Sequence, residues 1–150
     1  MKLLVAVDGS EASHKALQKA IDLAVPTHGL VVLMTVVEPV SDYFPKVMMP
    51  TGDWVGWQST PNIELEKALM ETGQSLLQKG EDLCQQAGVE CQTRLEIGNP
   101  REIICAIAKD EAPDFLVIGS RGLGTVERLM LGSVSDFVVH HATRPVIVVR

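Results

Sequence analysis

The sequence predicts an α/β protein whose single domain is doubly wound, with a mostly parallel sheet and helices on both faces. Strand-length apolar runs alternate with segments of helical periodicity along the 150 residues, and such alternation implies right-handed crossovers between parallel strands. Most of the runs are continuously apolar, which is typical of strands covered on both faces. The length suits one domain of common size, so we expect residues 1–150 to form one domain.

The start of the chain predicts a strand, a helix and a second strand. Residues 2–7 (KLLVAV) form a continuous apolar run. Ser10 is a suitable N-cap, and apolar residues recur at helical spacing to about Val25, before Pro26 ends the helix. Residues 30–37 (LVVLMTVV) are apolar and rich in β-branched side chains, so we expect a second buried strand.

Residues 38–62 predict a long loop. The segment contains four prolines, together with Trp54 and Trp57, and shows no sustained periodicity. Loops of this length inside a compact domain are often functional. Two interpretations remain open. The segment is either a variable insertion that covers the edge of the domain, or a lid over a ligand or a surface for a partner.

The next segments predict a helix and a strand. Apolar positions at helical spacing in residues 63–87 indicate one long helix that stops at Gly88 and is weakened locally by Gly73 and Gly80. Residues 89–97 alternate between apolar and polar side chains. This alternation is typical of a strand with one face in water, nearer the edge of the sheet.

The last third predicts two further helix and strand pairs. Asn99 and Pro100 form a helix start, with Glu102 in position to complete a capping box. Residues 114–118 form the fourth apolar run. A helix follows with Val134, Phe137, Val138 and His141 on one face, and residues 146–149 (VIVV) form a terminal strand.

Charge and composition exclude several classes of partner. The net charge is −6 and there is no basic run, which argues against binding to nucleic acid or anionic lipid. No apolar run approaches the roughly 20 residues of a membrane helix, and the first apolar run is too short for a secretory signal. We therefore expect a soluble protein of the cytoplasm. Three cysteines without CxxC spacing indicate reduced thiols rather than disulfides or a zinc site.

A glycine-rich stretch after the fourth apolar run is the main candidate for a ligand site. Gly119 and Gly122 allow close approach of the backbone to a ligand, while Gly132 and Ser133 place free amides and a hydroxyl at the start of the last helix. The dipole of that helix favours an anion there. The spacing matches neither a P-loop nor a dinucleotide fingerprint.

The spacing G-x2-G-x9-G-[ST], the opening LLVAVDGSEAS, the segment VVLMTVVEP and the terminal RPVIVV together resemble the universal stress protein family. The resemblance covers nearly the whole chain. It implies a Rossmann-like fold related to the adenine nucleotide alpha hydrolases, with five parallel strands in the order 3-2-1-4-5. Strands 1 and 4 would then lie side by side, which brings Asp8 and the glycine-rich stretch to one cleft.

The resemblance also implies a set of nucleotide-binding residues. By motif position these are Val7, Asp8, Val36, Ile118, Gly119, Arg121, Gly122, Gly132, Ser133, Val134 and Ser135. Each has a structural alternative. Asp8, Ser133 and Ser135 can serve as helix caps, the glycines as ordinary turn residues, and Arg121 as a solvated cation. No metal ligands are predicted, and the histidines are interpreted as surface or packing residues.

These features predict a universal stress protein that binds ATP, AMP or ADP, with Mg²⁺ accompanying the phosphates, and acts in a stress response as a nucleotide-dependent regulator. Binding is favoured over turnover because Asp8 is the only obvious acid near the glycine-rich stretch. The alternatives are a protein-interaction module with a vestigial nucleotide site and a slow ATPase. The apolar terminal strand 146–149, with the family resemblance, predicts a homodimer through that edge.

Overall fold

The computed structural model describes residues 1–39, 47–48, 54–55, 63–121 and 131–150. A five-stranded sheet runs through it in the order β5-β2-β1-β6-β7, and every neighbouring pair is parallel. The strands are β1 (Lys2–Ala6), β2 (Leu30–Val37), β5 (Glu90–Ile97), β6 (Phe115–Gly119) and β7 (Val146–Val149). Counted along the chain within this sheet, the order is 3-2-1-4-5, so the predicted fold is confirmed.

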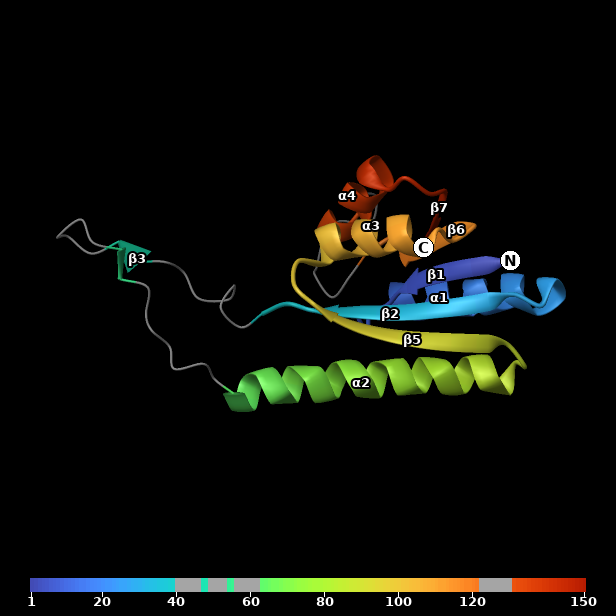
Figure 1. The fold of residues 1–150 in the computed structure, drawn as a ribbon, viewed down its shortest axis with the longest axis horizontal. Helices are drawn as coiled ribbons and strands as arrows, with labels where there is room; N and C mark the ends of the chain where they lie inside the picture. Colours follow the sequence, from blue (N-terminus) through green and yellow to red (C-terminus); the bar gives the residue numbers. More distant parts are fainter. Residues whose placement is uncertain (40–46, 49–53, 56–62, 122–130) are drawn as a thin grey trace.

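Four helices cover the sheet in two layers. They are α1 (Glu11–Ala24), α2 (Ile63–Gln86), α3 (Pro100–Glu111) and α4 (Ser133–His141). One core cluster joins one face of the sheet to α1 and α2, and the other joins the opposite face to α3 and α4. Figure 1 shows this division, with α2 below the sheet and α3 and α4 above it. None of the helices in the described ranges is both long and apolar enough to span a membrane.

Local sequence explains where the helices begin and end. The Ser10 hydroxyl oxygen caps α1 by accepting a hydrogen bond of 3.2 Å from the amide of Ser13. At the other end, Pro26 lies in a 3₁₀ turn (Val25–Thr27) that follows α1. The Asn99 side chain caps α3 by accepting from the amide of Arg101 at 3.0 Å. The predicted caps of both helices are therefore observed.

Two glycines in α2 bring this helix close to the sheet. A Cβ on Gly73 would lie 3.0 Å from Leu95 Cδ1, and a Cβ on Gly80 would collide with the side chain of Leu33. Gly73 and Gly80 lie on the buried face of α2 with Leu77 between them. The two residues that lower helix propensity are thus the ones that allow α2 to pack against β2 and β5.

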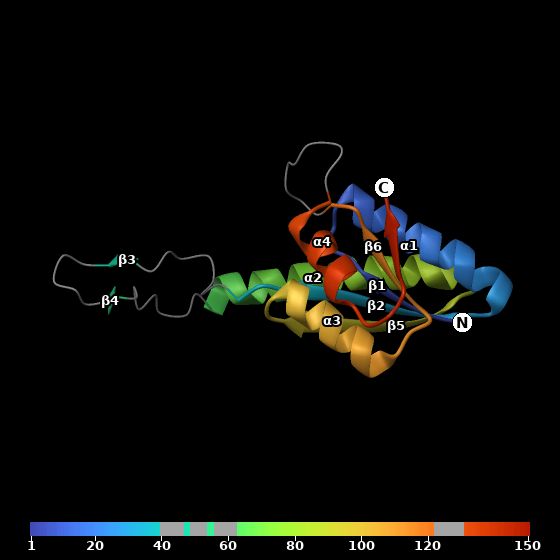
Figure 2. The same ribbon diagram turned by 90° about the horizontal axis from the view of Figure 1, so that it is seen from above.

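The two edge strands differ in cover. As the alternating pattern predicted, β5 forms one edge, and many of its side chains are exposed or half-buried. The other edge is β7, whose four residues are all half-buried. Figure 2 shows this C-terminal strand beside β6 at the end of the row of strands. The far side of β7 has no strand partner within the described part of the chain.

The prediction of a loop without regular structure over residues 38–62 is wrong at four residues. Val47–Met48 (β3) and Trp54–Val55 (β4) form a two-stranded antiparallel pair. Valine and tryptophan favour extended backbone, but a pair of two-residue strands is too short to produce a detectable period. The rest of that segment, residues 40–46, 49–53 and 56–62, lies outside the described residues, as do residues 122–130.

Candidate functional site

The carboxyl ends of β1, β2 and β6 surround a cavity of about 580 Å³. Its wall is formed by these strand ends together with α1, α2, α3 and the first turn of α4. Ten of the residues predicted for the site line it: Val7, Asp8, Val36, Ile118, Gly119, Arg121, Gly132, Ser133, Val134 and Ser135. The eleventh, Gly122, lies outside the described residues. The volume is within the range of small-molecule sites.

The first turn of α4 presents backbone amides at this cavity. Gly132 is the N-cap and has no side chain that could accept from the turn. Within the described residues, the amides of Ser133, Val134 and Ser135 donate no hydrogen bond. The helix has nine residues, so its dipole adds partial positive charge at this end. Unsatisfied amides and dipole together favour an anion.

The Ser135 hydroxyl has a structural contact at the same place. It lies 2.9 Å from the carbonyl oxygen of Ser120 and 2.9 Å from that of Gly132. The amide of Gly132 also donates to Ser120 O, at 2.8 Å. Ser135 therefore ties the first turn of α4 to the end of β6. The two serines differ, because Ser133 is exposed and Ser135 is buried.

Asp8 stabilises the turn between β1 and α1 and also borders the cavity. Its Oδ1 accepts from the amide and the hydroxyl of Ser10, at 3.0 and 2.6 Å. The same Ser10 hydroxyl lies 3.2 Å from the carbonyl oxygen of Arg121, which links this turn to the one after β6. The capping interpretation and the ligand interpretation of Asp8 are therefore compatible, because Oδ2 has no hydrogen bond within the described residues.

The packing of α1 against the end of β6 requires a glycine at position 119, whether or not a ligand binds there. A Cβ at this position would lie 2.7 Å from the carbonyl carbon of Ala12 and 2.8 Å from the amide nitrogen of Ser13. The missing side chain thus lets the first turn of α1 approach the end of β6. Gly119 also lines the cavity, so the expected close approach of its backbone to a ligand stays a prediction beside this packing role.

The end of β2 supplies a free backbone edge. β1 pairs with β2 only as far as Ala6 and Met34, followed by a hydrogen bond of 2.9 Å from the amide of Val7 to the carbonyl of Met34. On its other side β2 stays paired with β5 as far as Val37 and Ile97. Val36 therefore lies where β2 extends past its inner neighbour. A planar ligand with donors and acceptors can pair with such an edge.

Several lining residues were not predicted from the sequence. They come from β2, α2 and α3, and include Thr35, Leu69, Thr72, Gly73, Pro100 and Ile104. The contribution of α2 depends on how closely it packs against the sheet, which periodicity does not reveal. Thr35 had a signal in the sequence, because it is the one polar residue in the apolar run LVVLMTVV.

The lining is mostly apolar with few charges. Among the described residues, its charged members are Asp8, Glu38 and Arg121. No group of three histidine, cysteine or acidic side chains that could hold a metal ion occurs among the residues the structure describes. The arrangement suits a ligand with an anionic group at α4 and a flat, largely apolar group near β2.

Comparison with protein families places the chain in a known group. The model of the universal stress protein family matches residues 1–150. The universal stress protein YxiE of Bacillus subtilis is 30% identical over 152 residues, covering 99% of this chain and 98% of that protein. A universal stress protein A-like protein of Arabidopsis thaliana is 41% identical over 78 residues, which span 52% of this chain and 45% of that protein.

Solved structures share the fold over the whole chain. The hypothetical protein MJ0577 superimposes with a TM-score of 0.80 at 25% identity, covering 99% of this chain and 94% of that one. A universal stress protein family protein from Arabidopsis thaliana, At3g01520, was solved with AMP bound. It gives a TM-score of 0.69 at 25% identity over 99% of this chain and 90% of that one.

Proposed function

We propose that this chain, which belongs to the universal stress protein family, binds an adenine nucleotide in the cavity at the carboxyl ends of its strands. The observation that carries the proposal is the set of three amides, of Ser133, Val134 and Ser135, which donate to no described residue and lie at the wall of that cavity. Asp8 and the free edge of β2 border the same space. An anion site and a site for a flat ring thus lie in one cavity.

The phosphate group would lie at the first turn of α4. Amides at a helix N-terminus donate to phosphate oxygens, and the dipole favours the negative charge. Gly132 carries no side chain that would compete for these amides. Arg121 lines the same cavity and adds a positive charge to it. The net charge of the protein is −6, so this site for an anion would lie in a protein that is negatively charged overall.

The nucleoside would lie over the ends of β1 and β2. The backbone of Val36 offers hydrogen-bonding groups to a base, and apolar side chains such as Ile118 and Val134 provide contact surface. The carboxylate of Asp8 is an acceptor suited to ribose hydroxyls. The AMP-bound Arabidopsis relative, at 25% identity, supports an adenine nucleotide as the ligand.

ATP, ADP and AMP share the groups that this cavity recognises, and a longer phosphate chain would bring Mg²⁺ with it. We propose binding rather than turnover, because Asp8 and Glu38, the lining acids among the described residues, belong to no group of three side chains there that could hold a metal ion. The protein would act in the cytoplasm as a regulator in a stress response, with nucleotide occupancy as its signal.

The uncovered edge at β7 supports a homodimer. All four residues of this strand are half-buried and apolar, and the strand pairs with β6 on one side. Pairing with the same strand of a second copy would bury these side chains and satisfy the free backbone groups. Light scattering at micromolar concentration should give twice the mass of one chain. A monomeric mass would contradict the proposal.

Calorimetric titration with AMP, ADP and ATP, with and without magnesium, tests the nucleotide site. A matched pair of variants isolates the amides. Ser133→Pro removes one amide hydrogen at the first position of a helix, where proline is tolerated, and the extended backbone of Gly132 (ψ 159°) suits a following proline. Ser133→Ala removes only the hydroxyl. We expect Ser133→Pro to weaken AMP binding about tenfold, and Ser133→Ala to weaken it less.

Two outcomes would count against this site. No binding of any of the three nucleotides at millimolar concentration would overturn the nucleotide proposal and leave the interaction module as the better description. Equal affinity of wild type and Ser133→Pro would show that the phosphate lies elsewhere. Circular dichroism of both variants checks that α4 is intact.

A further inference from the structure

Thr35 is an exception within β2. It is the only polar residue in the strand, and 5% of its surface is exposed. Alternation along the strand places its side chain on the face covered by α1 and α2, with Leu33, while Met34 faces α3 and α4. Its methyl group Cγ2 would lie 3.4 Å from a Cβ on Gly73 of α2.

The hydroxyl of Thr35 has no hydrogen-bond partner within the described residues. Three other hydroxyls at or near the cavity do have one. Ser13 donates to Ser10 O at 2.9 Å, Thr72 to Ala68 O at 2.8 Å, and Ser135 to Ser120 O at 2.9 Å. No side-chain oxygen or nitrogen that is sealed from solvent lacks a partner in the described part of the chain. The Thr35 oxygen is therefore open to the cavity that Thr35 lines.

In the free protein, water in the cavity can hydrogen-bond the Thr35 hydroxyl. A ligand that displaced this water without offering a hydrogen bond would leave the hydroxyl unpaired, at a cost of roughly 1–3 kcal/mol. Valine has nearly the same shape and would fill the same space without a group that needs a partner. The packing of β2 against α2 therefore gives no reason for a hydroxyl, whereas a ligand in the cavity does.

The position of Thr35 decides which part of a ligand it can reach. It precedes Val36 at the free edge of β2, where the strand extends beyond β1. The anion site at α4 follows β6, and β1 separates β2 from β6, so the two positions lie roughly 10 Å apart across the strands. This is too far for one phosphate group to contact both.

From this placement we infer that Thr35 is a specificity-determining residue whose hydroxyl hydrogen-bonds the nucleoside half of the bound nucleotide, either its base or its ribose. The inference rests on the proposed function, since it names a contact within the same cavity. The ligand replaces the water that the cavity otherwise provides to this oxygen. A ligand without a polar group at this position would leave the hydroxyl unpaired, and the cavity would discriminate against it.

The test compares Thr35→Val, which removes the hydroxyl and keeps the shape, with two controls. Thr35→Ser keeps the hydroxyl, and Thr27→Val removes a hydroxyl outside the cavity that donates to Leu23 O at 2.9 Å. Calorimetric titration with AMP and with adenosine should show a five- to tenfold loss for Thr35→Val with both ligands. Thr35→Ser and Thr27→Val should stay within about twofold of wild type.

Stability and ligand analogues sharpen the result. The melting temperature of ligand-free Thr35→Val should equal or exceed that of wild type, whereas a structural role for the hydroxyl predicts a lower value. The partner on the ligand is identified with 2′-deoxy-AMP, 3′-deoxy-AMP and purine riboside monophosphate. The analogue that lacks the contacted group should bind wild type and Thr35→Val equally.

The outcomes separate this inference from the proposed function. Equal affinities of wild type and Thr35→Val for AMP would overturn this inference but not the proposed nucleotide site. A Thr35→Val variant with a lower melting temperature and unchanged AMP affinity would assign the hydroxyl to structure. Wild type that binds neither AMP nor adenosine would overturn both proposals. A loss for AMP but not for adenosine would move the contact to the phosphate and contradict the inference.

Discussion

The two ends of the same sheet treat their polar groups in opposite ways. At the amino end, where β1 begins and α3 ends, charged side chains and backbone groups are paired with one another. At the carboxyl end, amides of α4 and the hydroxyl of Thr35 have no partner within the described residues. The amino end thus contributes to stability, whereas the carboxyl end carries the polar groups that the proposed nucleotide site would use.

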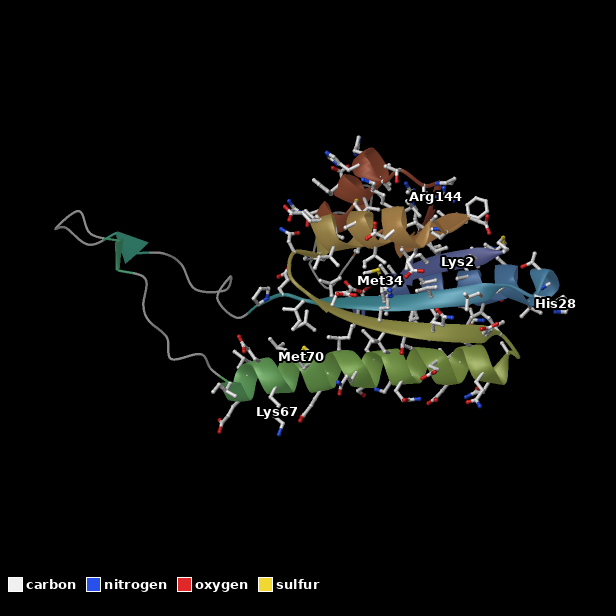
Figure 3. The ribbon with its side chains drawn as sticks, in the orientation of Figure 1. Lys2, His28, Met34, Lys67, Met70 and Arg144 are labelled. Atoms are coloured by element: carbon white, nitrogen blue, oxygen red, sulfur yellow. The ribbon has the colours of Figure 1, made fainter. Side chains whose placement is uncertain are left out.

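The amino end is held by a small network. Lys2 Nζ donates to Glu111 Oε2 at 2.6 Å, and Arg94 Nη2 lies 2.9 Å from Glu111 Oε1. Asp114 accepts from the amide of Lys2 at 2.7 Å, and Arg144 donates to the carbonyl of Pro113 at 2.7 Å. Figure 3 shows Lys2 and Arg144 at this end of the molecule.

This network satisfies the end of α3. Ala112, which follows α3, has φ 44°, a left-handed conformation that is uncommon for alanine. Its carbonyl oxygen accepts from Arg144 Nη2 at 3.1 Å. That of Glu111 accepts from Lys2 Nζ at 2.9 Å. Cations at the C-terminus of a helix also stabilise its dipole. The first turn of α4 has no comparable arrangement among the described residues, although its amides have the same need for partners.

Gly119→Ala should give the largest effect, because Gly119 connects β6 at the carboxyl end to α1. The added Cβ would lie within 3 Å of the backbone of Ala12 and Ser13, and backbone cannot move aside as a side chain can. We expect a loss of roughly 2–4 kcal/mol in the free energy of unfolding, measured with urea.

The control for that variant is Gly88→Ala, at a glycine with φ 71° and no atom within 4 Å of the added Cβ. There only the backbone conformation is strained, at a cost of about 1 kcal/mol. A Gly119→Ala protein that unfolds like wild type would contradict the close packing of α1 on β6.

Saturation with AMP should give the next largest effect. At a hundred times its Kd, a ligand that binds only the folded state adds about 2.7 kcal/mol to the free energy of unfolding. At the same AMP concentration, a tenfold weaker Ser133→Pro should gain about 1.4 kcal/mol. Thermal melts with and without AMP measure both increments.

Glu111→Gln serves as the amino-end counterpart in the same melts. It should keep the full AMP increment, because the substitution lies at the opposite end of the sheet. If Glu111→Gln lost the stabilisation by AMP while Ser133→Pro kept it, the assignment of stability to the amino end and of ligand binding to the carboxyl end would be wrong.

Glu111→Gln should also lower the free energy of unfolding of the ligand-free protein, and this is the smallest effect that we predict. The hydrogen bond from Lys2 holds the pKa of Glu111 below its ordinary value, and the charges of Lys2 and Arg94 add to this, while partial burial opposes it. The side chain is 19% exposed. We expect a loss of about 1 kcal/mol in the free energy of unfolding at pH 7.

The sign of the pH dependence follows from the lowered pKa. The contribution of Glu111 is fully present above the ordinary carboxyl pKa of about 4.3 and is lost as the pH falls through the lower pKa of the folded state. Wild type and Glu111→Gln should therefore differ in urea melts at pH 7 and converge as the pH falls through the lowered pKa of the folded state. A difference that grew on acidification would have the wrong sign for this ion pair.

The sequence predicted the fold because periodicity and caps are local. The runs 2–7, 30–37 and 114–118 agree with β1, β2 and β6 to within one residue at each end, and Ser10 and Asn99 cap the helices as expected. These patterns predict a mostly parallel sheet with right-handed crossovers, whereas the strand order 3-2-1-4-5 was implied by the resemblance to the universal stress protein family. The glycine-rich spacing also pointed to residues that line one cavity, because the ends of parallel strands meet at one edge.

What the sequence could not predict depends on packing between distant segments. The wall formed by α2 exists because Gly73 and Gly80 permit close contact, and a glycine in a helix otherwise indicates only weakness. The direction of the absent Cβ of Gly119, toward α1 rather than a ligand, required coordinates. Likewise, the Thr35 hydroxyl has no hydrogen-bond partner within the described residues because of the side chains packed around it. Its position in an apolar run does not reveal this.

The place of β1 in the middle of the sheet has a consequence for how the protein folds. Its neighbour β6 and its partner Asp114 follow Lys2 by more than a hundred residues, with a separation of 112 for the Lys2–Asp114 bond. The chain must lose the conformational entropy of closing this long loop before the contacts between β1 and β6 can form. This requirement slows folding. On the ribosome, β1 can bind β2 early but must wait for β6 before both its edges are paired. We therefore expect the cavity at the carboxyl ends of the strands to be completed late in folding.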